Sequence, residues 1–339
     1  MRLVLAIALA SLGGCGSGTS TPAAPPAPVR NSPSAAIWIH PGPAGALPVG
    51  GSTDFPSLFA GTTAWPTVAA RTSTFGLYAG VVAALDDATL GQIVSFLNAH
   101  LMTVELEAPA LQATSACGSG VEGYVAYGPG QPSLHDFTLA YLNRLKALGA
   151  NVAYIKVDEP YFFGSITSDS RSCHWAASVV AQAVAQFAQL AQSVYPNVQV
   201  GDVEPIVGNA YLPDVVTALA GWLDVYKTAS GSGFPFFTAD LDFTSPSWPT
   251  LALGLESAAH ARGMRFGIIY IGDYPDPSDQ VWASKVVARF QSFQETYGAT
   301  PDFVLFQSWE PHPYRCLPET DPTTFTGVVK EYVDTFGPK

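Results

Sequence analysis

The sequence predicts a single (β/α)8 barrel of the TIM type, and three observations support this prediction. A short apolar segment followed by a segment with helical spacing recurs eight times along 339 residues. Glycines stand where three of the helical segments end, at Gly149, Gly263 and Gly298. Several apolar segments end in a carboxylate, as where residues 152–157 lead into Asp158-Glu159. Alternating strands and helices are typical of a parallel barrel, in which the C-terminal strand ends form the active-site face.

Each strand is expected where apolar and β-branched residues form a short run that a turn or a carboxylate ends. The expected strands are residues 36–40, 75–79, 103–107, 152–157, 198–203, 236–241, 265–271 and 303–308. An open doubly wound sheet is the alternative fold. It favours a glycine-rich fingerprint after the first strand, and the sequence has none there.

Helices are expected between these strands, from helical spacing, capping residues and glycine stops. Apolar residues at 90, 93, 94 and 97 give residues 86–100 a helical face, and Ser133 to Asp136 resembles a capping box. The expected helices lie within 54–71 and at 86–100, 133–149, 175–195, 213–227, 249–262, 278–297 and 323–336.

The N-terminus predicts export. Arg2 precedes the apolar run 3–12, which is too short to span a bilayer, and Gly13-Gly14-Cys15 follows. This segment resembles a bacterial lipoprotein signal, which implies lipidation of Cys15. Residues 1–15 are therefore expected to be a signal peptide, 16–34 a disordered linker rich in Pro, Gly and Ser, and 35–339 the barrel. We expect a periplasmic, outer-membrane, cell-surface or secreted protein, with the lipid as its only membrane attachment.

Three cysteines remain in the barrel, Cys117, Cys173 and Cys316. In an oxidising compartment a Cys117–Cys173 bridge between neighbouring loops is expected, with Cys316 unpaired. The sequence alone leaves this pairing open.

Composition and charge limit the partners. Acidic residues outnumber basic ones 27 to 15, for a net charge of −12, which argues against nucleic acid as a ligand. A metal and a cofactor are not expected, because His40 has only His312 near it and no Cys/His ligand spacing occurs. We expect a monomer that acts on a glycan.

Strand alternation places several acids and one lysine on shared strand faces. Because unpaired buried charges are costly, we expect these side chains to point into the C-terminal mouth of the barrel rather than into the helix layer. The expected pairs are Glu105 and Glu107, Lys156 and Asp158, Asp202 and Glu204, and Asp240 and Asp242. Glu159, Asp273 and Glu310 are expected to complete the acidic ring, with His40 beside it.

Aromatic residues are expected along the same rim, Tyr270 and Trp309 among them. Carboxylates beside exposed aromatic faces are typical of sugar sites, where rings stack and acids transfer protons. Lys156, Glu107, His40, Asp202, Asp240, Tyr270, Trp309 and Glu310 are therefore the expected substrate-binding residues.

Residues 35–339 resemble glycoside-hydrolase-type barrels. Asp158-Glu159-Pro160 is similar to the Asn-Glu-Pro of clan A glycoside hydrolases, which implies Glu159 as acid/base, and Trp309 is similar to that clan's sugar-stacking Trp. The clan has a nucleophilic Glu ending strand 7, where this chain has Gly272-Asp273. Residues 154–158, Tyr-Ile-Lys-Val-Asp, also resemble the α-galactosidase clan, which implies Asp158 as nucleophile and Asp242 as acid/base.

These observations predict a glycoside hydrolase that cleaves a polysaccharide or oligosaccharide with two carboxyl groups, one protonated and one ionised. Glu159 is the expected acid/base. Glu204 is its expected partner, because residues 201–205 repeat the Asp-Glu-Pro style of strand 4, and Asp242 and Asp273 are the next candidates. The alternative is a carbohydrate-binding lipoprotein that keeps the barrel and the aromatic rim without catalysis.

Overall fold

The computed structural model describes residues 35–46, 50–108, 134–167, 174–207, 212, 214–274 and 276–337, with side chains from 139 onward in the third range. Contacts divide the chain into Met1–Pro33 and Ser34–Lys339, and the fold described below is that of the second unit. The expected signal peptide and linker, Cys15 and the expected Cys117–Cys173 bridge lie outside the described residues.

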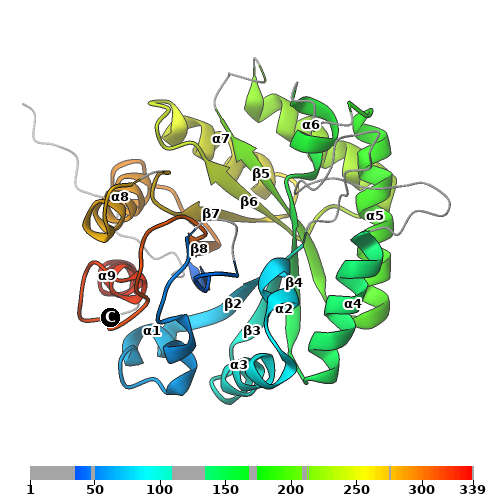
Figure 1. Ribbon diagram of the computed structural model, residues 1–339. Coiled ribbons are helices and arrows are strands. Elements are labelled where there is room, and N and C mark those ends of the chain that lie inside the picture. The colour runs from blue at the N-terminus through cyan, green and yellow to red at the C-terminus, as the bar shows by residue number, and fades with distance from the viewer. Residues whose placement is uncertain are drawn as a thin grey trace, which may run out of the picture. The chain divides into compact units, whose positions relative to one another are not determined.

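Eight parallel strands form a closed barrel in chain order, β1 to β8, and β8 pairs with β1 (Figure 1). The strands are β1 (Ala36–Pro41), β2 (Thr72–Tyr78), β3 (Thr103–Ala108), β4 (Val152–Asp158), β5 (Gln199–Ile206), β6 (Phe236–Leu241), β7 (Arg265–Tyr270) and β8 (Phe303–Ser308). The predicted (β/α)8 barrel is confirmed. Closure by the β1–β8 pairing rules out the open-sheet alternative.

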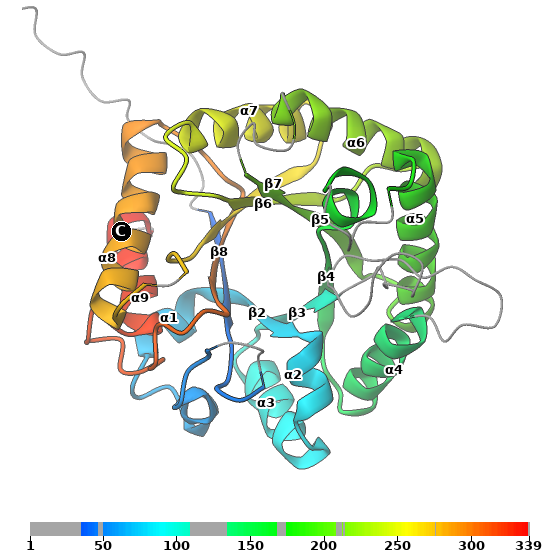
Figure 2. The ribbon, with the colours of Figure 1, turned by 45° about the horizontal axis from the view of Figure 1, so that its top comes forward.

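Helices surround the strands as an outer ring (Figure 2). They are α1 (Pro66–Arg71), α2 (Ala79–Ala84), α3 (Asp87–Ala99), α4 (Leu134–Ala147), α5 (Ala177–Val194), α6 (Val215–Ser230), α7 (Trp248–His260), α8 (Asp279–Gln291) and α9 (Phe325–Phe336). None of the helices in the described part of the chain combines the length and apolar character needed to cross a bilayer.

Short helical segments are the main departure from the expected elements. A 3-10 helix, η1 (Phe55–Ala60), precedes α1, and the π-helical turns η2 (Phe162–Ile166) and η4 (Ser292–Thr296) follow β4 and α8. A second difference is that β5 extends three residues past its expected end, so that Glu204 lies within the strand. The orientation of Glu204 is therefore set by strand alternation.

Aromatic side chains fill the barrel interior toward its N-terminal end. Trp38 stacks on Phe303 with ring centroids 4.2 Å apart, and Tyr154 lies 4.5 Å from Trp38. The guanidinium of Arg265 lies 5.2 Å from the Phe303 ring. Gly267 is needed here, because a Cβ at this position would lie 2.1 Å from the Phe303 ring. This packed layer confines any ligand site to the C-terminal end of the interior.

Candidate active site

Polar side chains from four strands meet inside the barrel at its C-terminal end. The ammonium of Lys156 on β4 lies 3.4 Å from Oε1 of Gln307 on β8, and these strands are not neighbours in the barrel. The contact must therefore cross the interior. Asp158 lies two residues beyond Lys156 on the same strand face.

Glu107 on β3 is the centre of this cluster. Its Oε2 lies 2.6 Å from Nζ of Lys156 and accepts a 2.9 Å hydrogen bond from Nε2 of Gln307. Burial alone would lower the pKa of Lys156, but the carboxylates of Glu107 and Glu105 raise it above its usual value. Lys156 is thus a fixed cation rather than an amine nucleophile. The side chain of Glu107 is 12% exposed and so reaches the edge of the buried cluster.

A second pair lies beside Glu107 and is fully buried. Nδ1 of His40 is 3.3 Å from Oε2 of Glu105, and neither side chain makes a hydrogen bond within the described part of the chain. Burial raises the pKa of Glu105 to about 8 despite the Lys156 charge. Burial, with the Lys156 charge, holds the pKa of His40 well below its ordinary value. The pair is therefore a neutral imidazole beside a protonated carboxyl group at neutral pH.

Two further acids face the same end of the barrel. Burial raises the pKa of Asp240, on β6, to about 6, and the Glu107 charge acts in the same direction. Burial raises the pKa of Glu310, just after β8, to about 8, and the charges of Asp276, Asp273 and Asp240 add to this effect. Oε2 of Glu310 is buried and accepts no hydrogen bond from the described residues. At neutral pH, Glu310 is thus protonated while Asp240 is largely ionised.

Asp273, three residues beyond the end of β7, is held in ion pairs. It contacts Arg289, and one of its oxygens lies 2.9 Å from Nζ of Lys285, which also contacts Asp276. Burial acts to raise the pKa of Asp273, but the contacts with Lys285 and Arg289 bring it below its usual value. These pairs tie Asp273 and Asp276 to α8.

The expected inward orientation of the β5 acids is wrong. Val203 packs among the interior side chains, so that Asp202 and Glu204 face the helix layer. Asp202 accepts a 2.7 Å hydrogen bond from Nε1 of Trp222 on α6, and Glu204 accepts hydrogen bonds from the amides of Tyr161 and Phe162. Hydrogen-bond donors on the helix side offset part of the burial cost that led to the opposite expectation.

One other expected site residue, Tyr270, is also turned away from the interior, and a second, Asp242, is held in a turn. Tyr270 is fully buried between β7 and the helices, and its hydroxyl accepts a 3.2 Å hydrogen bond from Gln294. Asp242 lies just beyond β6, where its Oδ1 accepts hydrogen bonds from the amide and hydroxyl of Thr244. The expectation that Tyr270 lines a rim is therefore wrong, and Asp242 stabilises a turn.

Glu159 ends β4 in a left-handed conformation, with φ of 48°. This region disfavours residues with a Cβ, and such outliers gather at functional sites. Three of the exposed large aromatics, Tyr274, Trp309 and Tyr314, lie on the loops after β7 and β8, on either side of Glu310 in sequence. Trp309, just after β8, has 39% of its surface exposed, and its expected role in binding substrate stays a prediction.

Four residues of this region were not expected from the sequence: Gln307, Asp276, Lys285 and Arg289. Gln307 lies two residues after Leu305 on the inward face of β8, and this spacing could have identified it. The other three come from a loop and from α8, where no periodic signal marks a contact. Among the described residues, no three His, Cys, Asp or Glu side chains are grouped so as to hold a metal ion. Cys316 is buried as a free cysteine.

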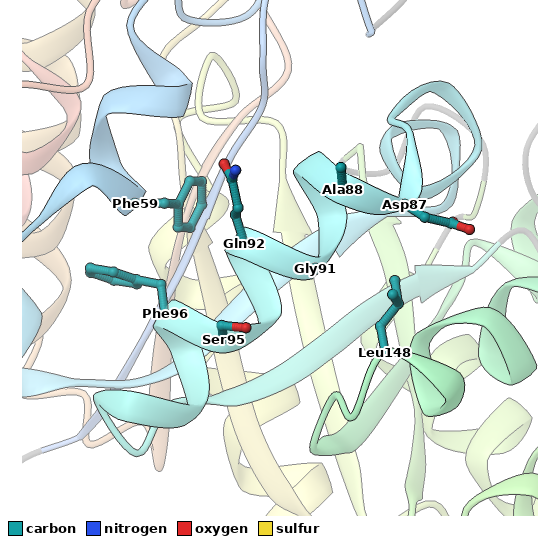
Figure 3. A pocket seen from close by; sticks show the side chains of 8 residues that line it. All are labelled: Phe59, Asp87, Ala88, Gly91, Gln92, Ser95, Phe96 and Leu148. Carbon is teal, nitrogen blue, oxygen red and sulfur yellow. The ribbon is translucent and has the colours of Figure 1, made fainter.

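A hollow on the outside of the barrel, between η1, α3 and the end of α4, has a volume of about 690 Å³ (Figure 3). Its lining is Phe59, Asp87, Ala88, Gly91, Gln92, Ser95, Phe96 and Leu148. Asp87 is paired with Arg144 at 2.6 Å. This hollow therefore offers no unpaired acid or base for chemistry.

A search of protein families and a search of curated proteins each find no match to this sequence. Solved structures of similar fold include a GH10 endoxylanase retrieved from a sugarcane soil metagenome, at 12% identity and a TM-score of 0.51, covering 88% of this chain and 97% of that one. A xylanase from Cellvibrio japonicus is 10% identical with a TM-score of 0.48, covering 82% and 59% of the two chains. A D-psicose 3-epimerase from Clostridium cellulolyticum is 10% identical with a TM-score of 0.46, covering 89% and 99%. The match to the endoxylanase shows that this chain shares the (β/α)8 fold with a glycoside hydrolase.

Proposed function

We propose that this protein is a glycoside hydrolase whose carboxyl groups at the C-terminal end of the barrel cleave a glycosidic bond. The observation that carries the proposal is the contrast between Glu310, with a pKa of about 8, and Asp240, with a pKa of about 6. Glycosidic cleavage needs one protonated and one ionised carboxyl group at the same site. Burial, with the charges of neighbouring acids, raises both pKa values, so that at neutral pH Glu310 is protonated and Asp240 is largely ionised.

In this proposal Glu310 donates a proton to the leaving oxygen, and Asp240 stays ionised to act on the sugar or on a water molecule. The Glu107–Lys156 pair and Gln307 supply fixed polar groups for sugar hydroxyls. Trp309, Tyr274 and Tyr314 offer exposed rings for stacking on sugar faces. Glu159, implied as acid/base by its resemblance to clan A, is the competing proton donor.

The test is hydrolysis of a broad panel of polysaccharides and aryl glycosides by the full chain and by Glu310→Gln, Asp240→Asn and Glu159→Gln. A variant lacking the proton donor keeps activity on aryl glycosides with good leaving groups, because departure of those groups needs no proton. We expect this pattern for Glu310→Gln and loss on all substrates for Asp240→Asn. If Glu159→Gln, and not Glu310→Gln, keeps activity only on aryl glycosides with good leaving groups, the proton donor is Glu159 and our assignment is rejected.

A non-catalytic carbohydrate-binding barrel is the second candidate. The ion pairs of Asp273 favour it, because they occupy the acid nearest to the clan A nucleophile position. Glycan binding by affinity electrophoresis without turnover on any substrate of the panel would establish this second function instead.

We also infer export and lipid attachment at Cys15 from the N-terminal sequence, which leads us to place a monomeric enzyme outside the cytoplasm. Incorporation of labelled palmitate by the full chain, and its loss in Cys15→Ser, tests this inference. Size-exclusion chromatography with light scattering tests the monomeric state.

A further inference from the structure

The turn that carries Glu159 is built from strained backbone. Glu159 has φ of 48°, a conformation that costs a residue with a Cβ about 1 kcal/mol or more. Its amide donates to the carbonyl of Val203 at 3.0 Å, and its carbonyl accepts from the amide of Phe163 at 3.1 Å. These two bonds fix the peptide groups on both sides of the strained residue. They leave open what holds the amides of residues 161 and 162.

Glu204 holds those two amides from the helix side of the barrel. Its Oε1 accepts from the amide of Tyr161 at 2.6 Å, and its Oε2 accepts from the amide of Phe162 at 3.0 Å. The side chain of Glu204 is fully buried. We call this arrangement the Glu204 clamp. It satisfies two donors at the start of a helical turn and leaves the turn little freedom to move.

A second layer supports the clamp. The ring of Tyr161 stacks on Trp222 with centroids 5.0 Å apart and planes 3° apart, and Trp222 donates its indole N–H to Asp202. Burial raises the pKa of Asp202 well above its usual value. Burial and the charge of Asp202 raise the pKa of Glu204, whereas the hydrogen bonds from the two amides act to lower it. The two amide donors favour the ionised form of Glu204, and the indole donor favours that of Asp202.

The clamp is costly for a purely structural element. In the described part of the chain no Lys or Arg pairs with either acid, and apolar packing is often at least as stabilising as buried charge. A carboxylate has the two acceptor oxygens that two converging amides require, whereas a glutamine has one. The geometry therefore gives Glu204 a role in placing the turn that begins after Glu159.

We propose that Glu204 is a positioning residue, which holds Glu159 at the C-terminal end of the barrel by clamping the amides of Tyr161 and Phe162. The role expected for Glu204 from sequence, direct catalysis, is replaced by action through its neighbour. The catalytic consequence rests on a glycan-cleaving or glycan-binding function in which Glu159 takes part, as the competing proton donor beside Glu310 or as a group that binds the sugar. The clamp itself does not.

The chain provides a matched control. Glu319 is also buried and also accepts from two successive amides, those of Thr67 at 3.1 Å and Val68 at 2.9 Å, at the start of α1. Its clamp has the same chemistry and touches none of the proposed catalytic carboxyl groups. The full chain is therefore compared with Glu204→Gln and Glu319→Gln by amide hydrogen exchange and by steady-state kinetics from pH 5 to 9.

We expect Glu204→Gln to accelerate exchange at residues 161–162 about 10-fold or more, and to lower kcat by about 10- to 100-fold with similar pH limbs, as misplacement without a change in titrating groups predicts. Glu319→Gln is expected to accelerate exchange at residues 67–68 and to leave kcat within about twofold. Unchanged exchange at residues 161–162 in Glu204→Gln would overturn the clamp. Loss of one pH limb in that variant would make Glu204 a titrating catalyst and overturn the positioning role, as would an equal loss of kcat in both variants.

Exchange separates the clamp from the proposed function. If the wild type turns over no glycan, the proposed function fails, and the exchange data still decide whether the clamp exists. If Glu204→Gln does not fold, Trp222→Phe replaces it. This variant keeps an aromatic ring for Tyr161 and removes the donor to Asp202, and we expect faster exchange at residues 161–162. Amide exchange at residues 161–162 of Trp222→Phe at the wild-type rate would count against the clamp.

Discussion

The ammonium of Lys156 lies 2.6 Å from Oε2 of Glu107, and the same oxygen accepts the side-chain amide of Gln307. Three strands, β3, β4 and β8, are thereby joined through the barrel interior at its C-terminal end. The pair places one fixed positive charge among acids. Through that charge it influences the proton affinities of Glu105 and Asp240.

Removing only one charge of the Glu107–Lys156 pair is expected to lower the free energy of unfolding more than removing both charges. Lys156→Met leaves a mostly buried carboxylate without its cation and should lower the free energy of unfolding by about 3 kcal/mol or more. Adding Glu107→Gln should recover part of that loss. Urea unfolding of the wild type, both single variants and the double variant measures the coupling. Additive losses would show that the pair contributes no net interaction.

The pH dependence of hydrolysis is expected to be bell-shaped. Asp240 must be ionised, so activity falls below about pH 6, and Glu310 must be protonated, so activity falls above about pH 8. The kcat/KM profile of the wild type tests both limbs, and Glu310→Gln should lack the alkaline limb in its residual activity on activated aryl glycosides. A persistent alkaline limb in that variant would assign the limb to another group.

Stability should fall as pH rises from 5 to 7, in part because of Glu105. Its pKa is about 8 in the folded protein, whereas the unfolded chain loses this proton near its ordinary value of 4.5. The stabilisation is therefore complete below about pH 4.5 and is lost as pH rises through 8, by about 1.4 kcal/mol per pH unit. Glu105→Gln removes this pH-dependent loss. Between pH 5 and pH 7 the free energy of unfolding of the variant should therefore rise by about 3 kcal/mol relative to that of the wild type. Parallel unfolding curves for the two proteins would contradict the buried, protonated Glu105.

Glu159→Gly should stabilise the fold relative to Glu159→Ala. Both variants lose the carboxyl group, but only glycine adopts φ of 48° without strain, which is worth about 1 kcal/mol. Thermal unfolding of the two variants isolates the backbone contribution. Equal melting temperatures would show that the turn imposes no strain on residue 159.

Gly76→Ala should disturb the buried pair of His40 and Glu105 without replacing either of these two residues. A Cβ at Gly76 would lie 2.3 Å from Cγ of His40 and 2.8 Å from Oε2 of Glu105. The overlap is expected to cost about 1–3 kcal/mol of stability and to displace the imidazole. Urea unfolding and the ¹H–¹⁵N spectrum of His40 measure the two effects, and an unshifted imidazole with wild-type stability would contradict this packing.

Periodicity determined the fold. Eight apolar strands alternating with helices leave few architectures that bury every strand, and the strand ends of a barrel must share one face. The acids of β3 and β4 therefore lie where sequence analysis expected them.

Which residues form the site depends on which face of each strand points inward. For β5, the free-energy cost of burying charge led to the wrong face. Asp202 and Glu204 were expected inside because unpaired buried charge is unfavourable, yet Trp222 and the amides of Tyr161 and Phe162 provide donors on the helix side. Those donors are remote in sequence or belong to a turn with no periodic signal. The sequence by itself determined the barrel and the end at which its acids gather. Only the tertiary structure decided which acids face the interior, because that depends on hydrogen-bond partners brought together by folding.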